Sequence, residues 1–159
     1  MSNLVLLTKV GSSDSIESVV AFDGLRGGNL VVLGARNANG TFPITAPVAV
    51  TDQKMVLVAP VCLPYSDTQM EHDYQIEAGN VERAYVPVKG RVYGVPVINI
   101  TATDPVAVGN FVVPQAGNAE MESLQAANLA GNETVQFEII QLFAKAGVNY
   151  ASLLCVKSE

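Results

Sequence analysis

Residues 56–97 read VLVAPVCLPYSDTQMEHDYQIEAGNVERAYVPVKGRVYGVPV, and they are the most informative part of the chain about its fold. Short valine-rich runs stand at both of its ends, and β-branched side chains favour extended backbone because their χ1 freedom is restricted in a helix. Between the runs, residues 67–82 carry five carboxylates and no lysine or arginine. The stretch therefore predicts pairs of short strands on either side of a solvated acidic connector.

The same pattern of short apolar runs, separated by glycine, proline and asparagine, continues in both directions along the chain. It predicts strands at residues 4–10, 16–22, 29–34, 54–62, 83–89, 91–101, 106–113, 135–143 and 148–156. Residues 41–50 contain Pro43 and Pro47, each of which removes a ladder donor, so this segment is expected to be an edge strand or a loop.

Short strands at this spacing are typical of β-barrels and β-sandwiches. We therefore expect an all-β fold of small β-barrel or sandwich units joined by the acidic connector, with at most one short helix. The expected division is an N-terminal β unit (1–64), the connector (65–82) and a C-terminal β unit (83–159). The length of 159 residues permits either one compact domain with a single core or two separate cores.

Residues 119–128 read AEMESLQAAN and are ambiguous. Asn118 is a candidate N-cap, and Met121, Leu124 and Ala127 recur at helical spacing. The pattern taken alone favours a short helix here.

Composition narrows the class of partner. The formal net charge is −6 and lysine and arginine form no cluster, so no nucleic-acid partner is expected. No apolar run is long enough to span a bilayer and the first residues lack the features of a signal peptide, so we expect a protein made in a cytosol, with no membrane partner. Cys62 and Cys155 both lie in apolar runs and are expected to be small buried side chains, and a disulfide would require their strands to be neighbours.

Residue types that carry catalysis are sparse. The single histidine, His72, lies among Glu71, Asp73 and Glu77 in a segment better interpreted as a solvated acidic loop than as a metal site, and no G-x-S-x-G motif is present. Residues 24–28, GLRGG, lack the Lys-Ser/Thr of a phosphate-binding loop and predict a turn.

A glycosidase needs two carboxylates that converge across a cleft, and the sequence offers two pairs, Glu120 with Glu122 and Glu133 with Glu138. The chain has no tryptophan, the usual side chain on which a sugar stacks. We therefore expect no enzymatic activity, no metal and no cofactor.

Several segments, in this order, resemble the small capsid decoration proteins, or head-stabilising accessory proteins, of tailed bacteriophages. The segments are GNLVVLG (28–34), TAP (45–47), MVLVAP (55–60), EAG (77–79), RAY (83–85) and VAVGNFVVP (106–114). The resemblance implies a structural virion protein that binds the outer surface of the major capsid lattice and stabilises the head. Its implied partners are the major capsid protein and other copies of itself, on the capsid surface of a virion assembled in the host cytoplasm. The resemblance also argues for a strand, rather than a helix, at residues 119–128.

The connector departs from this family because it has no basic counterweight before Arg83. If it touches a capsid, the facing surface should be basic. The candidate contact residues are Leu4, Val5, Leu6 and Leu7 of an apolar N-terminal arm and Glu71, Asp73 and Glu77 of the connector. The alternative for residues 4–7 is an ordinary first strand in the core.

The alternative function is that of a β-sandwich module, in a virion appendage, that binds a glycan or a receptor. Such a module would need a concave aromatic face. The tyrosines that would have to supply it together are Tyr65, Tyr74, Tyr85, Tyr93 and Tyr150.

Overall fold

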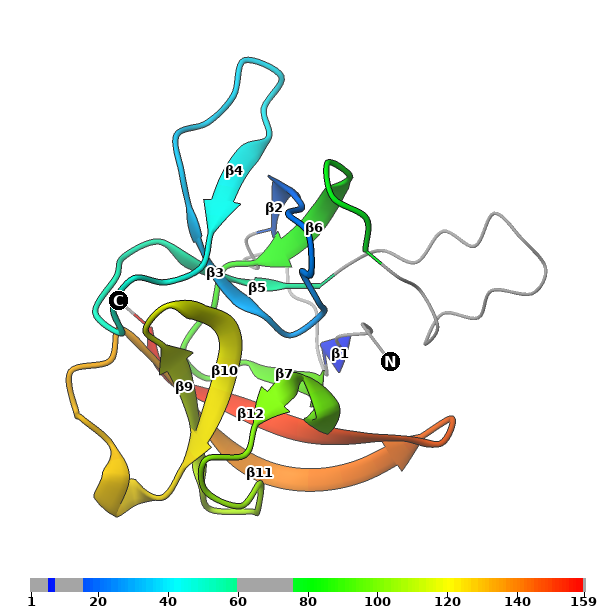
Figure 1. The fold of residues 1–159 in the computed structure, drawn as a ribbon. Helices are drawn as coiled ribbons and strands as arrows, with labels where there is room; N and C mark the ends of the chain where they lie inside the picture. The colour runs from blue at the N-terminus through cyan, green and yellow to red at the C-terminus, as the bar shows by residue number, and fades with distance from the viewer. Residues whose placement is uncertain (1–5, 8–15, 60–75, 159) are drawn as a thin grey trace.

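A closed barrel and a curled sheet make up the fold in a computed structural model of the chain, which describes residues 6–7, 16–59 and 76–158 (Figure 1). The five barrel strands follow the order β2-β4-β3-β5-β6. Their bounds are β2 Ile16–Val20, β3 Leu30–Leu33, β4 Phe42–Thr45, β5 Met55–Val58 and β6 Val81–Tyr85. All neighbours are antiparallel except β2 and β4, which run parallel.

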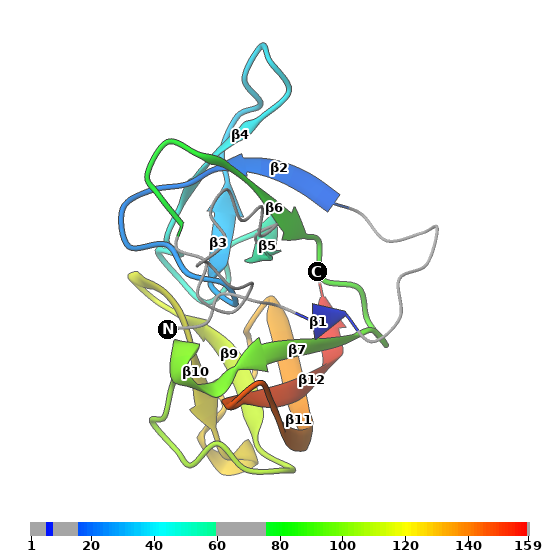
Figure 2. The ribbon, with the colours of Figure 1, turned by 90° about the vertical axis from the view of Figure 1, so that its right-hand side faces the viewer.

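The second unit is a seven-stranded sheet with the order β1-β7-β12-β11-β9-β10-β8. Its strands are β1 Leu6–Leu7, β7 Val92–Pro96, β8 Ile100–Thr101, β9 Phe111–Gln115, β10 Asn118–Leu124, β11 Val135–Lys145 and β12 Val148–Ser158. Figure 2 shows the barrel stacked on this sheet. The expected all-β class is thus confirmed, and the described helical segments are the short 3-10 turns η2 Val97–Asn99 and η3 Ala126–Asn128.

The helix favoured by the pattern of residues 119–128 is wrong. Residues 118–124 form strand β10, which pairs with β9 and β8, and η3 follows it. The core selects the strand because Met121 and Ser123, two residues apart, are both fully buried on its inner face. Local helix propensity is overridden by this tertiary burial.

Pro43 does not lie in an edge strand. Strand β4 runs between β2 and β3 inside the closed barrel, so the edge expected for residues 41–50 is absent there. The parallel ladder with β2 spans only the pairs Val19–Phe42 and Val20–Pro43. The proline is tolerated because it lies at the end of this short ladder, where the loss of one N–H donor interrupts no further pairing. Its carbonyl still accepts a hydrogen bond from the Gly34 N–H at 2.7 Å.

Strand β6 joins the barrel rather than the C-terminal unit, so the barrel continues to Tyr85, past the expected boundary at residue 82. Glu82 was expected in the solvated connector, yet it lies in β6 opposite Val19 and is only 4% exposed. At the other end of the chain, β1 pairs with β7 of the C-terminal sheet. The C-terminal sheet therefore contains a strand from the start of the chain, and the barrel contains a strand from beyond the connector.

Strand β5 is buried on both of its faces. Val56 and Val58 belong to a cluster of buried side chains in the barrel. Met55, Leu57 and Ala59 alternate with them and belong to a second cluster, which includes side chains of the C-terminal sheet. A strand covered on both faces is apolar throughout, and this explains the unbroken run from Met55 to Ala59.

Aromatic rings join the barrel to the sheet within that second cluster. Tyr85 of β6 packs against Tyr93 of β7 with ring centroids 6.0 Å apart, and Tyr93 meets Phe137 of β11 edge to face at 6.0 Å. All three rings are buried. One continuous core therefore spans both units.

Hydrogen bonds also cross between the units. The buried Asn99 side chain donates from Nδ2 to the Gly27 carbonyl at 2.8 Å. The N–H of Gly117 donates to the Pro47 carbonyl at 2.6 Å, and the N–H of Thr134 donates to the Val50 carbonyl at 3.0 Å. These bonds fix the loops of the barrel against the sheet.

Cys155 is a free, buried thiol, in agreement with the sequence-based expectation, and burial raises its pKa to about 11. Cys62 lies outside the described residues.

The segment 24–28 forms the expected turn, in which Gly24 and Gly28 adopt positive φ.

Glu133 shapes the loop that enters β11. Its side chain is 1% exposed and accepts hydrogen bonds from the N–H groups of Ala130 and Gly131 and from Nε2 of Gln136, each at 2.9 Å. Burial by itself would raise the pKa of Glu133, but the backbone N–H of Glu133 itself, together with these donors, outweighs it and holds the pKa below its ordinary value. The loop therefore depends on an ionised carboxylate.

Replacement of Gly28 tests the close approach of the two units. Gly28 has a φ of +90°, and a Cβ built there would overlap the Val95 side chain of β7, whereas Gly24 has a φ of +82° and open space around it. Both alanine variants incur the backbone penalty of about 1–2 kcal/mol. We expect Gly28→Ala to lower the free energy of unfolding by roughly 1–3 kcal/mol more than Gly24→Ala, because only it overpacks the junction. Equal losses in urea unfolding would contradict this packing.

Replacement of Glu133 tests the carboxylate of the loop. A carboxyl group with a lowered folded-state pKa stabilises the fold above its unfolded pKa, and this contribution is lost as the pH falls through the folded pKa. We expect Glu133→Gln to reduce the free energy of unfolding by roughly 2 kcal/mol at pH 7 and to flatten its decline on acidification. Glu77→Gln, at an exposed turn, is the control and should change stability by less than about 0.5 kcal/mol. An unaltered pH profile for Glu133→Gln would contradict the assignment.

Candidate binding surfaces

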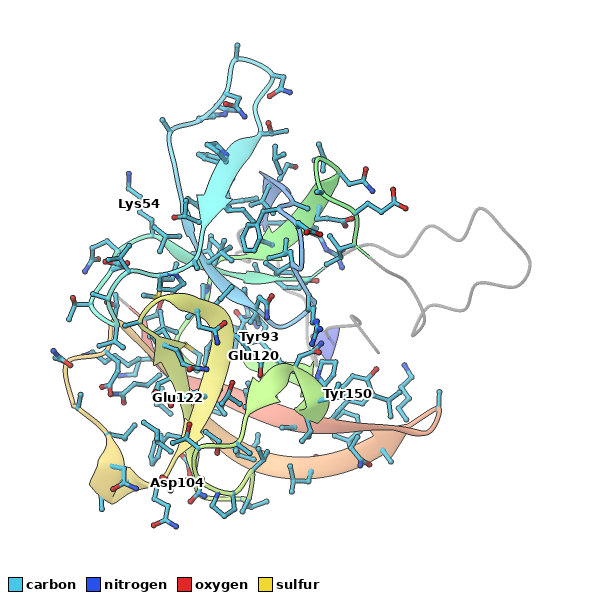
Figure 3. The ribbon with its side chains drawn as sticks, viewed as in Figure 1. Lys54, Tyr93, Asp104, Glu120, Glu122 and Tyr150 are labelled. Atoms are coloured by element: carbon cyan, nitrogen blue, oxygen red, sulfur yellow. The ribbon has the colours of Figure 1, made fainter. Side chains whose placement is uncertain are left out.

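Strand β10 presents two carboxylates on its outer face. Because Met121 and Ser123 are buried on the inner face, the alternating residues Glu120 and Glu122 point outward. Asp104 lies just beyond the end of the strand, where its N–H donates to the Ser123 carbonyl at 2.8 Å. Figure 3 shows Glu120, Glu122 and Asp104 following one another along this side of the sheet. We call these three residues the acidic strip.

Threonine hydroxyls hold two carboxylates of the acidic strip in place. The hydroxyl of Thr101 donates to Oε1 of Glu120, and that of Thr103 donates to Oε2 of Glu122, both at 2.8 Å. Gln115 on β9 donates from Nε2 to the Thr101 hydroxyl at 2.9 Å and to the Glu120 carbonyl at 2.8 Å. The carboxylates are therefore fixed by neighbouring elements of the sheet rather than left on free side chains.

Asp104 is fixed in a similar way and stays charged at neutral pH. Its Oδ2 accepts from Nδ2 of Asn128 at 2.8 Å and from the Gln125 N–H at 2.7 Å. The Asn128 bond, and then the Gln125 bond, lower the pKa of Asp104, against a small opposing effect of burial. At Asp104 the acidic strip thus ends in a negative charge that is fixed in position.

The acidic strip suits attraction of a basic surface better than ligation of an ion. Its carboxylates follow the strand, and the described part of the chain holds no group of three or more His, Cys, Asp or Glu side chains that could bind a metal. Beside it lies a cavity of about 310 Å³ at the junction of the two units, with Arg26 and Phe22 of the barrel on one side and Asn118 and Glu120 on the other. A polar side chain of a partner would fit this mixed environment.

The hairpin of β11 and β12 forms a second, apolar surface. A cavity of about 410 Å³ lies between this hairpin and the valines Val97 and Val106. Phe143 and Tyr150, a cross-strand pair, stack in its wall with ring centroids 5.4 Å apart. Exposed apolar side chains from the hairpin and the neighbouring loops are Ile98, Val108, Ile140 and Leu142. Of these, Leu142 also lines the cavity, and an exposed apolar surface of this kind typically marks an interaction site.

The contact residues expected from the sequence are only partly described. Leu6 and Leu7 form β1, where they pair with Gly94 and Tyr93, so their backbone belongs to the sheet. Leu4, Val5, Glu71 and Asp73 lie outside the described residues. Glu77 is exposed at a turn of the barrel, where the Asn80 N–H donates to its carbonyl at 3.2 Å. Whether these residues contact a capsid stays a prediction.

Sequence reasoning missed the acidic strip as a unit. Glu120 and Glu122 were considered only as a catalytic pair, and in the favoured helix they would have pointed in directions about 200° apart. In a strand they share one face. The alternation of Glu120, Met121, Glu122 and Ser123 was the signal that could have found them. In the other pair, both carboxylate oxygens of Glu133 accept hydrogen bonds from the loop before β11.

The described tyrosines supply no exposed aromatic platform. Tyr85, Tyr93 and Tyr150 are all buried, and Tyr65 and Tyr74 lie outside the described residues. The concave face needed for the glycan-binding alternative is therefore not formed by the tyrosines that the structure describes.

Among residues 6–7, 16–59 and 76–158, no helix has the length and apolar character needed to cross a bilayer. Comparisons of the chain with protein-family models, with curated proteins and with solved structures found no match.

Proposed function

We propose that this protein is a structural accessory protein of a virion, which binds the outer surface of the major capsid lattice and stabilises the head. The observation that carries the proposal is the acidic strip, a row of carboxylates held by hydrogen bonds on the outer face of the sheet. The resemblance to capsid decoration proteins of tailed bacteriophages supports the same assignment. The protein would act on the capsid surface after assembly in the host cytoplasm.

Fixed carboxylates favour binding to a basic surface. Long side chains normally lose rotational freedom when they pair with a partner, at a cost of about 0.5–1.5 kcal/mol each. The hydrogen bonds from Thr101, Thr103 and Asn128 have already restricted these side chains in the free protein. The acidic strip therefore presents its charges ready to meet lysines or arginines of the lattice.

Each single charge contact is weak, since an exposed ion pair contributes about 0.2–1 kcal/mol. A copy would bind firmly only where the lattice offers several such contacts at once. The net charge of −6 meanwhile favours the solubility of free copies before they reach the lattice. The apolar residues Leu4–Leu7 and the connector residues Glu71, Asp73 and Glu77 remain additional contact candidates.

Cosedimentation with heads that lack the protein tests the role of the acidic strip. We expect the wild type to bind expanded heads saturably and to bind less as salt rises, because salt screens exposed charges. The double variant Glu120→Gln/Glu122→Gln should bind roughly tenfold more weakly and with a smaller salt dependence, because two ion pairs are lost. Glu17→Gln/Asp23→Asn removes the same charge from the barrel and is the matched control.

Two results would reject this proposal. One is an absence of saturable binding by the wild type at any salt concentration. The other is an equal loss of binding for the strip and control variants, which would show that only the net charge matters.

A heat challenge tests the stabilising role separately. Because a ligand that binds only the intact lattice shifts its equilibrium away from disruption, occupied heads should release their DNA at a higher temperature than bare heads. Heads incubated with Glu120→Gln/Glu122→Gln at the same protein concentration should show a smaller increase. Full occupancy with no change in the release temperature would leave binding intact and refute stabilisation.

A further inference from the structure

Strand β11 has one open edge. It extends over Val135–Lys145, but β9 pairs only with Phe137 and Glu138. The loop before β9 adds two bonds at Ile139, from the Gly109 N–H to its carbonyl and from its N–H to the Asn110 carbonyl, each at 2.9 Å. Beyond that point, no strand of the described residues pairs with the side of β11 that faces away from β12. On the projecting hairpin (Figure 1), residues 140–145 thus have, on the side away from β12, an edge of about 20 Å to which no other described strand pairs.

The turn of the hairpin determines which backbone groups face this edge. Ala146 and Gly147 adopt φ of 51° and 77°, the geometry of a two-residue type I′ turn, and it places Lys145 opposite Val148 in a hydrogen-bonded pair. Antiparallel pairs alternate, so Phe143 and Gln141 also bond to β12. Ala144 and Leu142 therefore direct their N–H and carbonyl groups to the open edge.

The open edge lacks the usual protection against pairing. Natural edge strands are commonly shielded by charged residues or proline. Residues 139–156 contain no proline, and Lys145 is their only charged residue. Ile140 and Leu142 are 41% and 44% exposed beside the edge, and the apolar cavity lined by Leu142, Phe143 and Ala144 adjoins it.

We propose that β11 pairs through this edge with β11 of a second copy of the chain, as an antiparallel dimer about a two-fold axis at Phe143. In that register Leu142 faces the partner's Ala144 in a hydrogen-bonded pair, and the same pair recurs on the other side of the axis. Both outward-directed residues of each strand are then satisfied. The sequence of the edge is thus complementary to itself.

The side chains agree with this register. Phe143 faces the partner's Phe143 on the side of the sheet where it already stacks on Tyr150, so the aromatic row continues across the axis. Lys145 faces the partner's Gln141 rather than another lysine, so no like charges meet. The edge is also free of carboxylates, and it is therefore a region where two chains of net charge −6 approach with little repulsion.

The pairing is independent of the proposed capsid role, because it requires no lattice. A contact along one short edge buries less than the roughly 1,200 Å² of a stable interface, so the dimer is weak in solution. We expect sedimentation equilibrium of the wild type to show reversible dimers between about 10 µM and 1 mM. Raising the salt should preserve or strengthen the dimer, because it screens the repulsion between the acidic chains, whereas binding to a basic lattice would weaken.

Two variants and one control test the edge. Ala144→Pro removes an N–H that faces the open edge while it leaves the bonds to β12 intact, and Leu142→Lys adds a charge to the edge. Each should raise the dissociation constant roughly tenfold or more. Val48→Lys makes the same charge change at an apolar residue of the barrel that is 81% exposed, and it should leave the dimer unchanged. Circular dichroism checks that all three variants fold.

Several results would overturn the proposal. They are a wild type that stays monomeric to 1 mM at low and high salt, an oligomer that both edge variants leave intact, or a trimer, which a two-fold edge cannot produce. A monomeric wild type whose Leu142→Lys variant loses occupancy on heads would assign the edge to the capsid protein instead.

Discussion

Strand β5, buried on both of its faces, holds the barrel and the C-terminal sheet together. Val56 and Val58 fill the barrel, while Leu57, between them, packs toward the C-terminal sheet. Removal of this strand would therefore expose the buried side chains of both units. The tyrosines on β6 and β7 extend the same contact. Because the units share one core, we expect them to unfold together, and the surfaces they carry keep a fixed relation to each other.

The sequence predicted the strands well where an apolar run is both short and bounded by turns. It failed where a residue's role depends on partners far along the chain. Residues 119–128 contain good helix formers, and only their pairing with β9 and β8 makes β10 a strand. Pro43 suggested an edge, but closure of the barrel gives β4 two neighbours. Glu82 looked like part of a solvated segment because its charge is visible in the sequence and its place in β6 is not.

The candidate surfaces follow the same division. The composition predicted an acidic protein, but the acidic strip exists only because Glu120 and Glu122 share one face of a strand and Asp104 is bonded to the end of that strand. The open edge of β11 was even less accessible to sequence reasoning. It arises because β9 stops pairing at Glu138, while β11 and β12 continue for several residues beyond it. Such mismatches in strand length are set by the whole sheet and leave no local pattern.

The two surfaces lie on different parts of one sheet, and we expect binding at them to respond to salt in opposite directions. Attraction between the acidic strip and a basic partner weakens as ions screen it, whereas pairing of two acidic chains through an edge free of carboxylates gains from the same screening. Each copy bound to a charged lattice would raise the local concentration of neighbouring hairpins, and a pairing too weak to persist in solution would then become populated. The shared core holds the acidic strip and the open edge of β11 in a fixed relation. The orientation of the acidic strip on a lattice would therefore determine where a second copy must lie to pair with β11.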